Sequence, residues 1–139
     1  MTVIRRPLVA ALKADPAFVA MVTNYLGEPA IFADDLAPAD ATMPYVLVKP
    51  VSTVPLNTLR TKGRADSLDV HAFIRAGIGD VVLDAIEERL RDLFDEPATY
   101  PTVAGYHVYS ISVAGVMAGP YEPGIESRIV TLDVLMQRI

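Results

Sequence analysis

Few residues in this 139-residue chain have side chains that commonly do chemistry, and they form no catalytic pattern. The chain has two histidines, His71 and His107, and no cysteine. His71 follows Asp69 by two residues, so in a strand both side chains share one face. A polar pair on a sheet explains this spacing better than a general base does, because a base also needs a pocket and a nucleophile. Neither histidine has the spacing of a metal site, and catalysis is not indicated.

Two further patterns lack the neighbours that a binding site would need. Asp34 and Asp35 are adjacent carboxylates without the glycine-bearing loop of a calcium site, so a solvated loop or a helix cap explains them better. Gly77 and Gly79 lack the remaining spacing of a dinucleotide fingerprint, and the sequence contains no Walker-type phosphate loop. We therefore expect neither a metal nor a cofactor.

Arg60, Lys62 and Arg64 form the basic cluster of the sequence, around Gly63. They lie in a long polar stretch, residues 51–64, which we expect to project as a loop. Exposed cations are often only solvated, and surface ion pairs often contribute less than about 1 kcal/mol. In a protein that assembles, the same cations can meet an acidic neighbour and guide docking. Both explanations stay open, and this stretch is the first candidate for an interaction element.

Composition limits the class of protein. Apolar residues make up 52% of the chain and charged residues 21%, which is typical of a folded domain and of neither a disordered nor a membrane protein. The net charge of −5 argues against a protein that coats nucleic acid, because such binding depends on many lysines and arginines. No run of about 18 apolar residues suggests a membrane span, and the N-terminus has no secretion signal.

The periodicity of apolar residues predicts the elements that must position these side chains. Helical spacing is expected over residues 3–14, over a second short helix that starts at Pro16 and ends by Gly27, and over residues 80–94. Strands are expected at 45–49, 68–75, 106–117 and 125–139, with an ordered loop at 28–44. This order predicts an α+β fold: a mainly antiparallel four-stranded sheet with helices packed on one face.

The second face of the predicted sheet is richer in apolar residues than a purely solvated face needs. Tyr45, Leu47, Phe73 and Leu135 alternate toward it beside several polar residues. Such a patch can mark a subunit interface. Ordinary exposed apolar area, or coverage by the loop at 28–44, explains it equally well.

Four stretches, taken in order, carry a family resemblance. They are residues 8–19 (LVAALKADPAFV), 41–48 (ATMPYVLV), 69–73 (DVHAF), and 121–124 (YEPG) ahead of 128–134 (RIVTLDV). In order, spacing and total length they resemble the small tail terminator or tail-completion proteins of long-tailed phages, prophages and gene-transfer particles. None of the stretches is a catalytic motif.

The resemblance implies a single tail-terminator-like domain over residues 1–139, which is a structural protein and not an enzyme. Such a subunit forms a ring, typically a hexamer, at the head-proximal end of the tail tube, stops tube polymerisation and joins the tail to the head. The implied partners are further copies of the chain, the tail tube protein and a head connector or stopper protein. DNA would pass through the ring without specific binding, and no membrane is involved. Assembly would take place in the bacterial cytoplasm, and the protein would end in the tail of a virion or phage-like particle.

The residues that we expect to make contacts follow from the sequence pattern and not from the resemblance: Arg60, Lys62, Arg64, Leu47, Phe73 and Leu135. Other functions also fit a small acidic α+β protein. A head-tail adaptor or stopper would share its size and ring formation. A small-molecule-binding or enzymatic domain would need a deep pocket with convergent polar groups. A DNA-binding adaptor would need a continuous basic surface.

Overall fold

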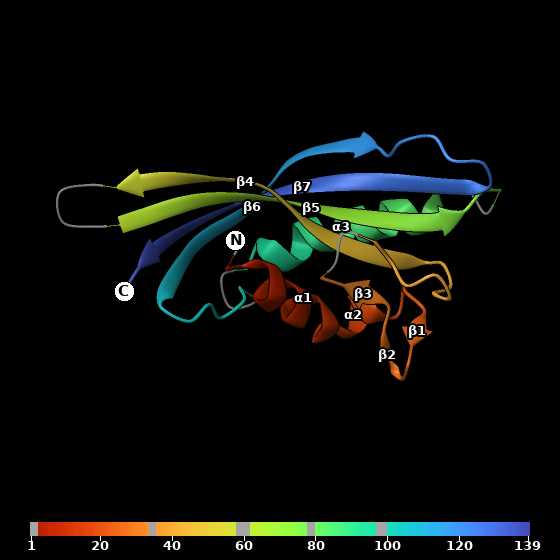
Figure 1. Cartoon of the computed structure of the whole chain (residues 1–139), viewed down its shortest axis with the longest axis horizontal. Helices are drawn as coiled ribbons and strands as arrows, with labels where there is room; N and C mark the ends of the chain where they lie inside the picture. Colours follow the sequence, from red (N-terminus) through yellow and green to blue (C-terminus); the bar gives the residue numbers. More distant parts are fainter. Residues whose placement is uncertain (1–2, 34–35, 58–61, 78–79, 97–99) are drawn as a thin grey trace.

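The computed structural model describes residues 3–33, 36–57, 62–77, 80–96 and 100–139. It is an α+β fold with three helices, α1 (Arg5–Lys13), α2 (Pro16–Val19) and α3 (Val81–Phe94). A small two-stranded sheet holds β1 (Asn24–Tyr25) and β2 (Glu28–Pro29). The main sheet holds β3 (Ile31–Phe32), β4 (Tyr45–Asn57), β5 (Lys62–Arg75), β6 (Tyr106–Ala118) and β7 (Ile125–Arg138), in the order β3-β4-β5-β7-β6 (Figure 1).

The prediction of a four-stranded sheet was wrong by one strand. β3 adds a fifth, parallel strand, in which Ile31 and Phe32 pair with Val46 and Leu47. The other neighbouring strands are antiparallel, as expected. β3 lies in the segment predicted as an irregular loop, and two residues are too few to produce a period-2 signal. The second predicted helix was also too long, because α2 ends at Val19.

Strands replace the predicted loop at residues 51–57 and 62–64. β4 continues to Asn57 and β5 begins at Lys62; residues 58–61, which include Arg60, lie outside the described part. Pro50 and Pro55 hide β4 in the sequence, because proline lacks the N–H of a ladder bond. The two prolines are accommodated because this part of β4 is a sheet edge. β3 pairs only with the start of β4, so no described strand needs a hydrogen bond from the outer edge of β4 near Pro50 or Pro55.

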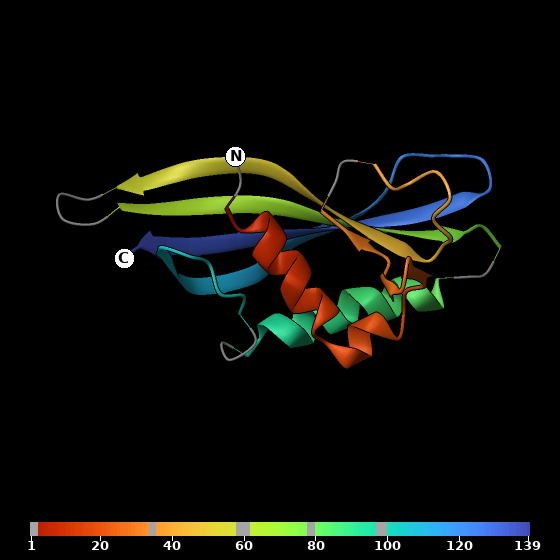
Figure 2. The same cartoon turned by 60° about the horizontal axis from the view of Figure 1, so that its bottom comes forward.

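The helices lie on one face of the sheet and form the core with it (Figure 2). Leu83, Ile86 and Leu90 of α3 recur at helical spacing and are buried, as are Leu8 and Leu12 of α1. The sheet contributes its own alternating set to this core: Val46, Val48, Leu68, Val70, Val130, Leu132 and Val134. None of the described helices has the length and apolar character needed to cross a bilayer.

An ion pair fastens the helices to one another. Asp15 caps α2 by accepting a hydrogen bond from the backbone N–H of Phe18 at 3.0 Å. Both of its carboxylate oxygens also accept hydrogen bonds from Arg89 of α3, each at 2.7 Å. A charged fork-to-fork contact of this kind fixes orientation as well as distance. The helix layer is therefore held by a polar clamp in addition to apolar packing.

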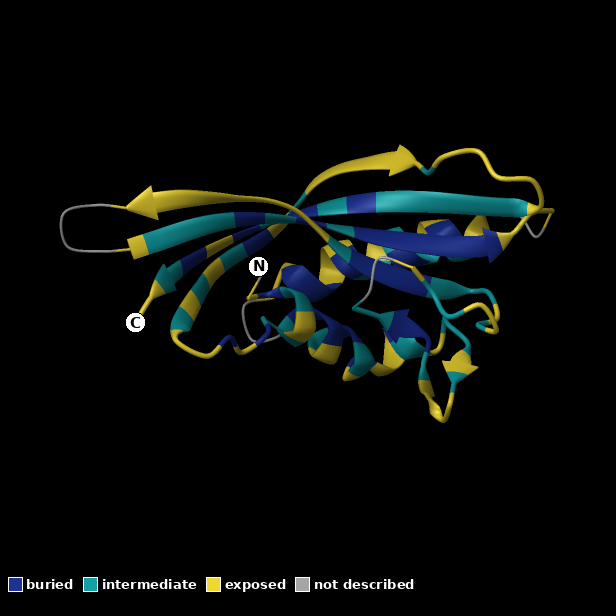
Figure 3. Cartoon of the chain, in the orientation of Figure 1, coloured by how far each residue is buried: buried dark blue, intermediate teal, exposed yellow. Residues whose placement is uncertain are grey.

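The far half of the β4–β5 hairpin extends beyond the helices (Figures 1 and 2). We call residues 51–57 and 62–66 the hairpin arm. Every residue of β4 within it is exposed, including Val51, Val54 and Leu56 (Figure 3). The same two strands are mostly buried where they pass the helices.

Candidate functional site

His71 is buried in β5 and has no catalytic partner among the described residues. Its Nε2 atom has no hydrogen-bond partner there, and its ring stacks on Phe73 with the centroids 4.0 Å apart. Burial, aided by the positive charge of Lys49, lowers the pKa of His71 to about 4, while Asp69 opposes this shift. Gly119 lies so close that an added Cβ would stand 2.7 Å from Nε2. His71 is therefore a neutral packing residue in a closed environment.

Most of the predicted apolar patch on the second face is covered by the chain itself. Leu47 is 2% exposed and Phe73 is 8% exposed. Segments 36–41 and 120–122 lie against them around a hollow of about 420 Å³. Four aromatic rings also contact one another in sequence here: Tyr25 packs on Phe32, Phe32 on Tyr45, and Tyr45 on Phe73. Coverage by the loop thus accounts for Leu47 and Phe73, and neither offers a surface to a partner in this conformation.

Leu135 is the member of that patch that stays exposed, at 41%. It pairs across β5 with Ala65, which pairs in turn with Val54 of β4, so the three share a face beside the hairpin arm. Between Leu135 and the covered end the face is polar: the Ser67 hydroxyl donates to Asp133 at 2.8 Å, and the Thr131 hydroxyl donates to Asp69 at 2.7 Å. The exposed member of the predicted patch, Leu135, therefore lies beside the arm.

Two members of the predicted basic cluster, Lys62 and Arg64, lie on the arm, and they differ in how far they are exposed. Arg64 donates from Nε to Asp66 at 2.9 Å, its side chain is only 14% exposed, and its guanidinium lies 5.7 Å from the ring centre of Tyr106. Lys62 is exposed. Together with Arg138 at the end of β7, Lys62 and Arg64 line a hollow of about 220 Å³, which we call the basic hollow. Arg60 and the adjacent carboxylates Asp34 and Asp35 lie outside the described residues.

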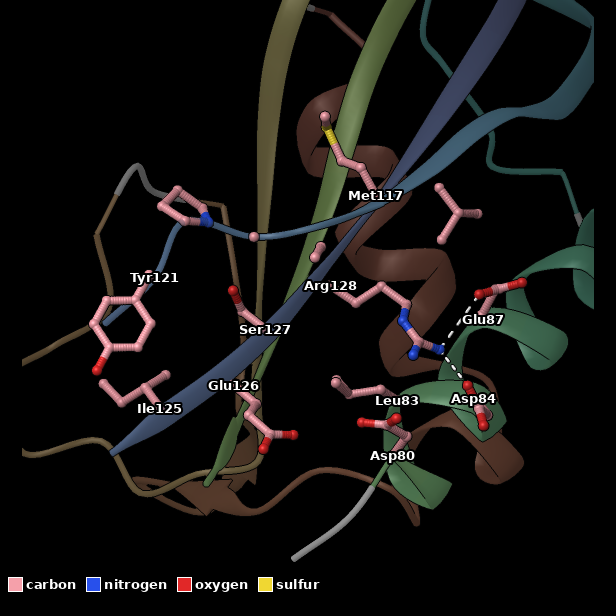
Figure 4. Close-up of a pocket in the computed structure, with 14 residues that line it drawn as sticks. Asp80, Leu83, Asp84, Glu87, Met117, Tyr121, Ile125, Glu126, Ser127 and Arg128 are labelled. Carbon is pink, nitrogen blue, oxygen red and sulfur yellow. Dashed lines mark hydrogen bonds and ion pairs between the residues drawn. The ribbon is translucent and has the colours of Figure 1, made fainter. Parts of the chain in front are cut away.

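A larger hollow of about 620 Å³ opens at the other end of the sheet, between α3 and the ends of β6 and β7 (Figure 4). We call it the acidic groove. Four carboxylates line it, those of Asp80, Asp84, Glu87 and Glu126, against one guanidinium, that of Arg128. Apolar side chains also reach it, and Val116, Met117 and Tyr121 among them are exposed.

Arg128 neutralises only part of the charge in the acidic groove. Its guanidinium donates to Asp84 and lies 3.4 Å from Glu87, as the dashed lines in Figure 4 mark. The hydrogen bond to Asp84 and the surrounding carboxylates raise the pKa of Arg128, so it stays charged. Asp80 and Glu126 form no salt bridge in the described part of the chain. The groove therefore keeps a net negative charge.

Sequence reasoning missed the acidic groove. In the sequence, Asp84 and Glu87 have the spacing of an ordinary polar helix face, and Glu126 lies about 40 residues farther along the chain. Only the antiparallel return of β7 beside β5 brings Glu126 near the start of α3. Nothing in the local pattern signals that meeting. Within the described ranges, no three metal-binding side chains come together either.

The chain was compared with protein families, with curated proteins and with solved structures. The sequence profile of the family described as tail completion protein gp17 matches residues 6–113. In a direct sequence comparison, no curated protein matches the chain.

The fold is similar to that of a chain in a solved structure titled "Virion of native gene transfer agent (GTA) particle". The two superpose with a TM-score of 0.75, over 96% of this chain and 94% of the other, at 14% sequence identity. At this identity the likeness establishes a common fold. The family match covers most of the sequence, from α1 into β6, and includes both strands of the hairpin arm. The chain thus belongs to the family of tail completion protein gp17, and its place is the tail of a phage-like particle.

Proposed function

We propose that this protein forms a ring at the head-proximal end of a tail tube, stops polymerisation of the tube and joins the tail to the head. The observation that carries the proposal is the family match over residues 6–113. The role is structural: a single domain, without a cofactor, works through contacts with further copies of itself, with the tail tube protein and with a head connector.

The surface chemistry supports an assembly role over a DNA-binding role. The net charge of −5 repels a polyanion, and such repulsion would let DNA pass through a ring without being held. The exposed hairpin arm and the acidic groove differ in shape and charge, and two different surfaces on one subunit permit head-to-tail contacts. Head-to-tail contacts close into a ring when the rotation between subunits allows it. A hexamer is the proposed closed form.

The experiment that tests this function measures mass and tube length together. Light scattering after size exclusion gives the mass of the purified protein alone and mixed with its tail tube protein. Electron microscopy of tubes grown with and without it gives their lengths. We expect a ring, alone or in the mixture, and tubes that stop growing once capped. A protein that stays monomeric in both samples and leaves tube growth unchanged would refute the proposal. Rings that bind the head connector but leave tube growth unchanged would point to an adaptor role instead.

A further inference from the structure

The basic hollow and the acidic groove lie at opposite ends of the same strand. Residues 125–128 at the start of β7 line the groove, and Arg138 at its end lines the hollow. A strand of 14 residues spans about 45 Å, since each residue rises about 3.3 Å. Charge is therefore separated along the length of the subunit, with cations at the arm end and carboxylates at the helix-start end.

Each end also exposes apolar side chains, which lie beside the charges at the groove and on the opposite face of the strands from Lys62 and Arg138 at the arm. Val54, Leu56 and Leu135 are exposed at the arm. Val116, Met117 and Tyr121 are exposed at the acidic groove. Stable protein interfaces pair surfaces of opposite charge, and the two ends supply this match: cations line the hollow at the arm, and carboxylates line the groove.

We infer that the hairpin arm of one copy docks into the acidic groove of the next copy, with Lys62 and Arg138 against Asp80 and Glu126. This inference rests on the proposed function and specifies the contact that builds the ring. The contact joins two different surfaces, so an open chain of subunits keeps one free arm at one end and one free groove at the other until the ring closes. The groove cannot suit nucleic acid, because its carboxylates repel phosphates.

The four charged residues suit a test by charge reversal, because none of them forms a salt bridge within the described part of the chain. The arm variant carries Lys62→Glu and Arg138→Glu, and the groove variant carries Asp80→Lys and Glu126→Lys. Each places like charges against each other when it meets its own copies. We expect the self-association constant of each variant, measured by sedimentation at low salt, to fall at least tenfold.

Two further samples distinguish a broken contact from a misfolded subunit. An equimolar mixture of arm and groove variants pairs opposite charges at every junction, since acidic arms meet basic grooves and native arms meet native grooves. We therefore expect the mixture to recover the mass of the wild-type assembly. One chain with all four substitutions should recover it as well. A control with Glu88→Lys and Asp92→Lys on the exposed face of α3 changes the net charge as much as the groove variant does and should assemble normally.

The outcomes separate the contact from the function. A wild-type protein that assembles, with arm and groove variants that assemble equally well, would overturn the docking contact and leave the proposed ring intact. Loss of tube binding without loss of self-association would also overturn it, because the groove would then receive the tube protein. A wild-type protein that forms no assembly alone or with the tube protein would remove the proposed function itself.

Discussion

Two halves of one hairpin behave differently in this protein. Where β4 and β5 pass the helices, Val46, Leu47 and Val48 are buried in a row, and so are residues 70–74 of β5. Beyond the helices every described residue of β4 is exposed. Backbone pairing between the strands continues through both halves, apart from a shift between Pro50 and Ser52. Hydrogen bonding between the strands therefore gives the whole hairpin its shape. Burial differs between the halves: the half beside the helices stabilises the fold, and the exposed arm is available to a partner.

The largest expected effect compares two leucines at the two ends of this contrast. Leu68→Ala, in the covered half of β5, removes a fully buried side chain from the core and should lower the free energy of unfolding by about 2–5 kcal/mol. Leu56→Ala on the exposed arm should cost roughly 0.5 kcal/mol or less. Urea unfolding followed by circular dichroism measures both. Equal losses would show that the arm is part of the stabilising core after all.

The next effect is the pH dependence of stability that His71 causes, in the part of the sheet that segments 36–41 and 120–122 cover. The pKa of His71 is lowered by burial to about 4, against about 6.5 when unfolded, so protons bind the unfolded chain more readily between these values. Stability should be full above about pH 6.5 and should fall by about 3 kcal/mol as the pH drops toward 4. His71→Gln should remove this loss, whereas His107→Gln, on the exposed start of β6, should retain it. Unfolding curves at pH 7 and pH 4.5 make the measurement, and an unchanged slope in His71→Gln would contradict the assignment.

The smallest effect concerns the ion pair between Asp15 and Arg89, which joins the helices. Hydrogen bonds from Arg89 hold the pKa of Asp15 below its usual value, so the charged carboxylate stabilises the fold at neutral pH. Asp15→Asn should cost about 1–2 kcal/mol at pH 7. The difference from wild type should shrink as the pH falls through the lowered pKa, because the wild-type carboxyl then loses its charge too. Asp92→Asn on the exposed face of α3 serves as the control, and a cost that does not shrink as the pH is lowered would argue against an ionic clamp.

Sequence reasoning predicted the long elements and missed the two-residue strand β3 and the far half of β4. The stripe of α3, with Leu83, Ile86 and Leu90, predicted a helix over residues 80–94, and α3 spans Val81–Phe94. The alternation in β5 and β7 likewise predicted strands. β3 went unseen because it is two residues long, and the arm went unseen because Pro50 and Pro55 break the alternation of β4.

The candidate site was harder to predict than the fold because it depends on distant residues meeting. Lys62 and Arg64 were identified by their spacing, yet Arg138 joins them only through the pairing of β5 with β7. Asp66 was not foreseen as the partner of Arg64, although the two lie on one face of β5. The acidic groove needed the placement of α3 beside β6 and β7, and no local pattern fixes that placement.

The two edges of the main sheet bear on how a stock of unassembled subunits survives in the cell. Pro50 and Pro55 remove backbone donors from β4, and β6 carries two register shifts, near Ser110 and Gly115. Both features are unfavourable for adding another strand. Free subunits therefore resist stacking into fibres through their backbones. Specific joining is left to side chains, and charges and apolar groups on side chains can distinguish the right neighbour from a wrong one.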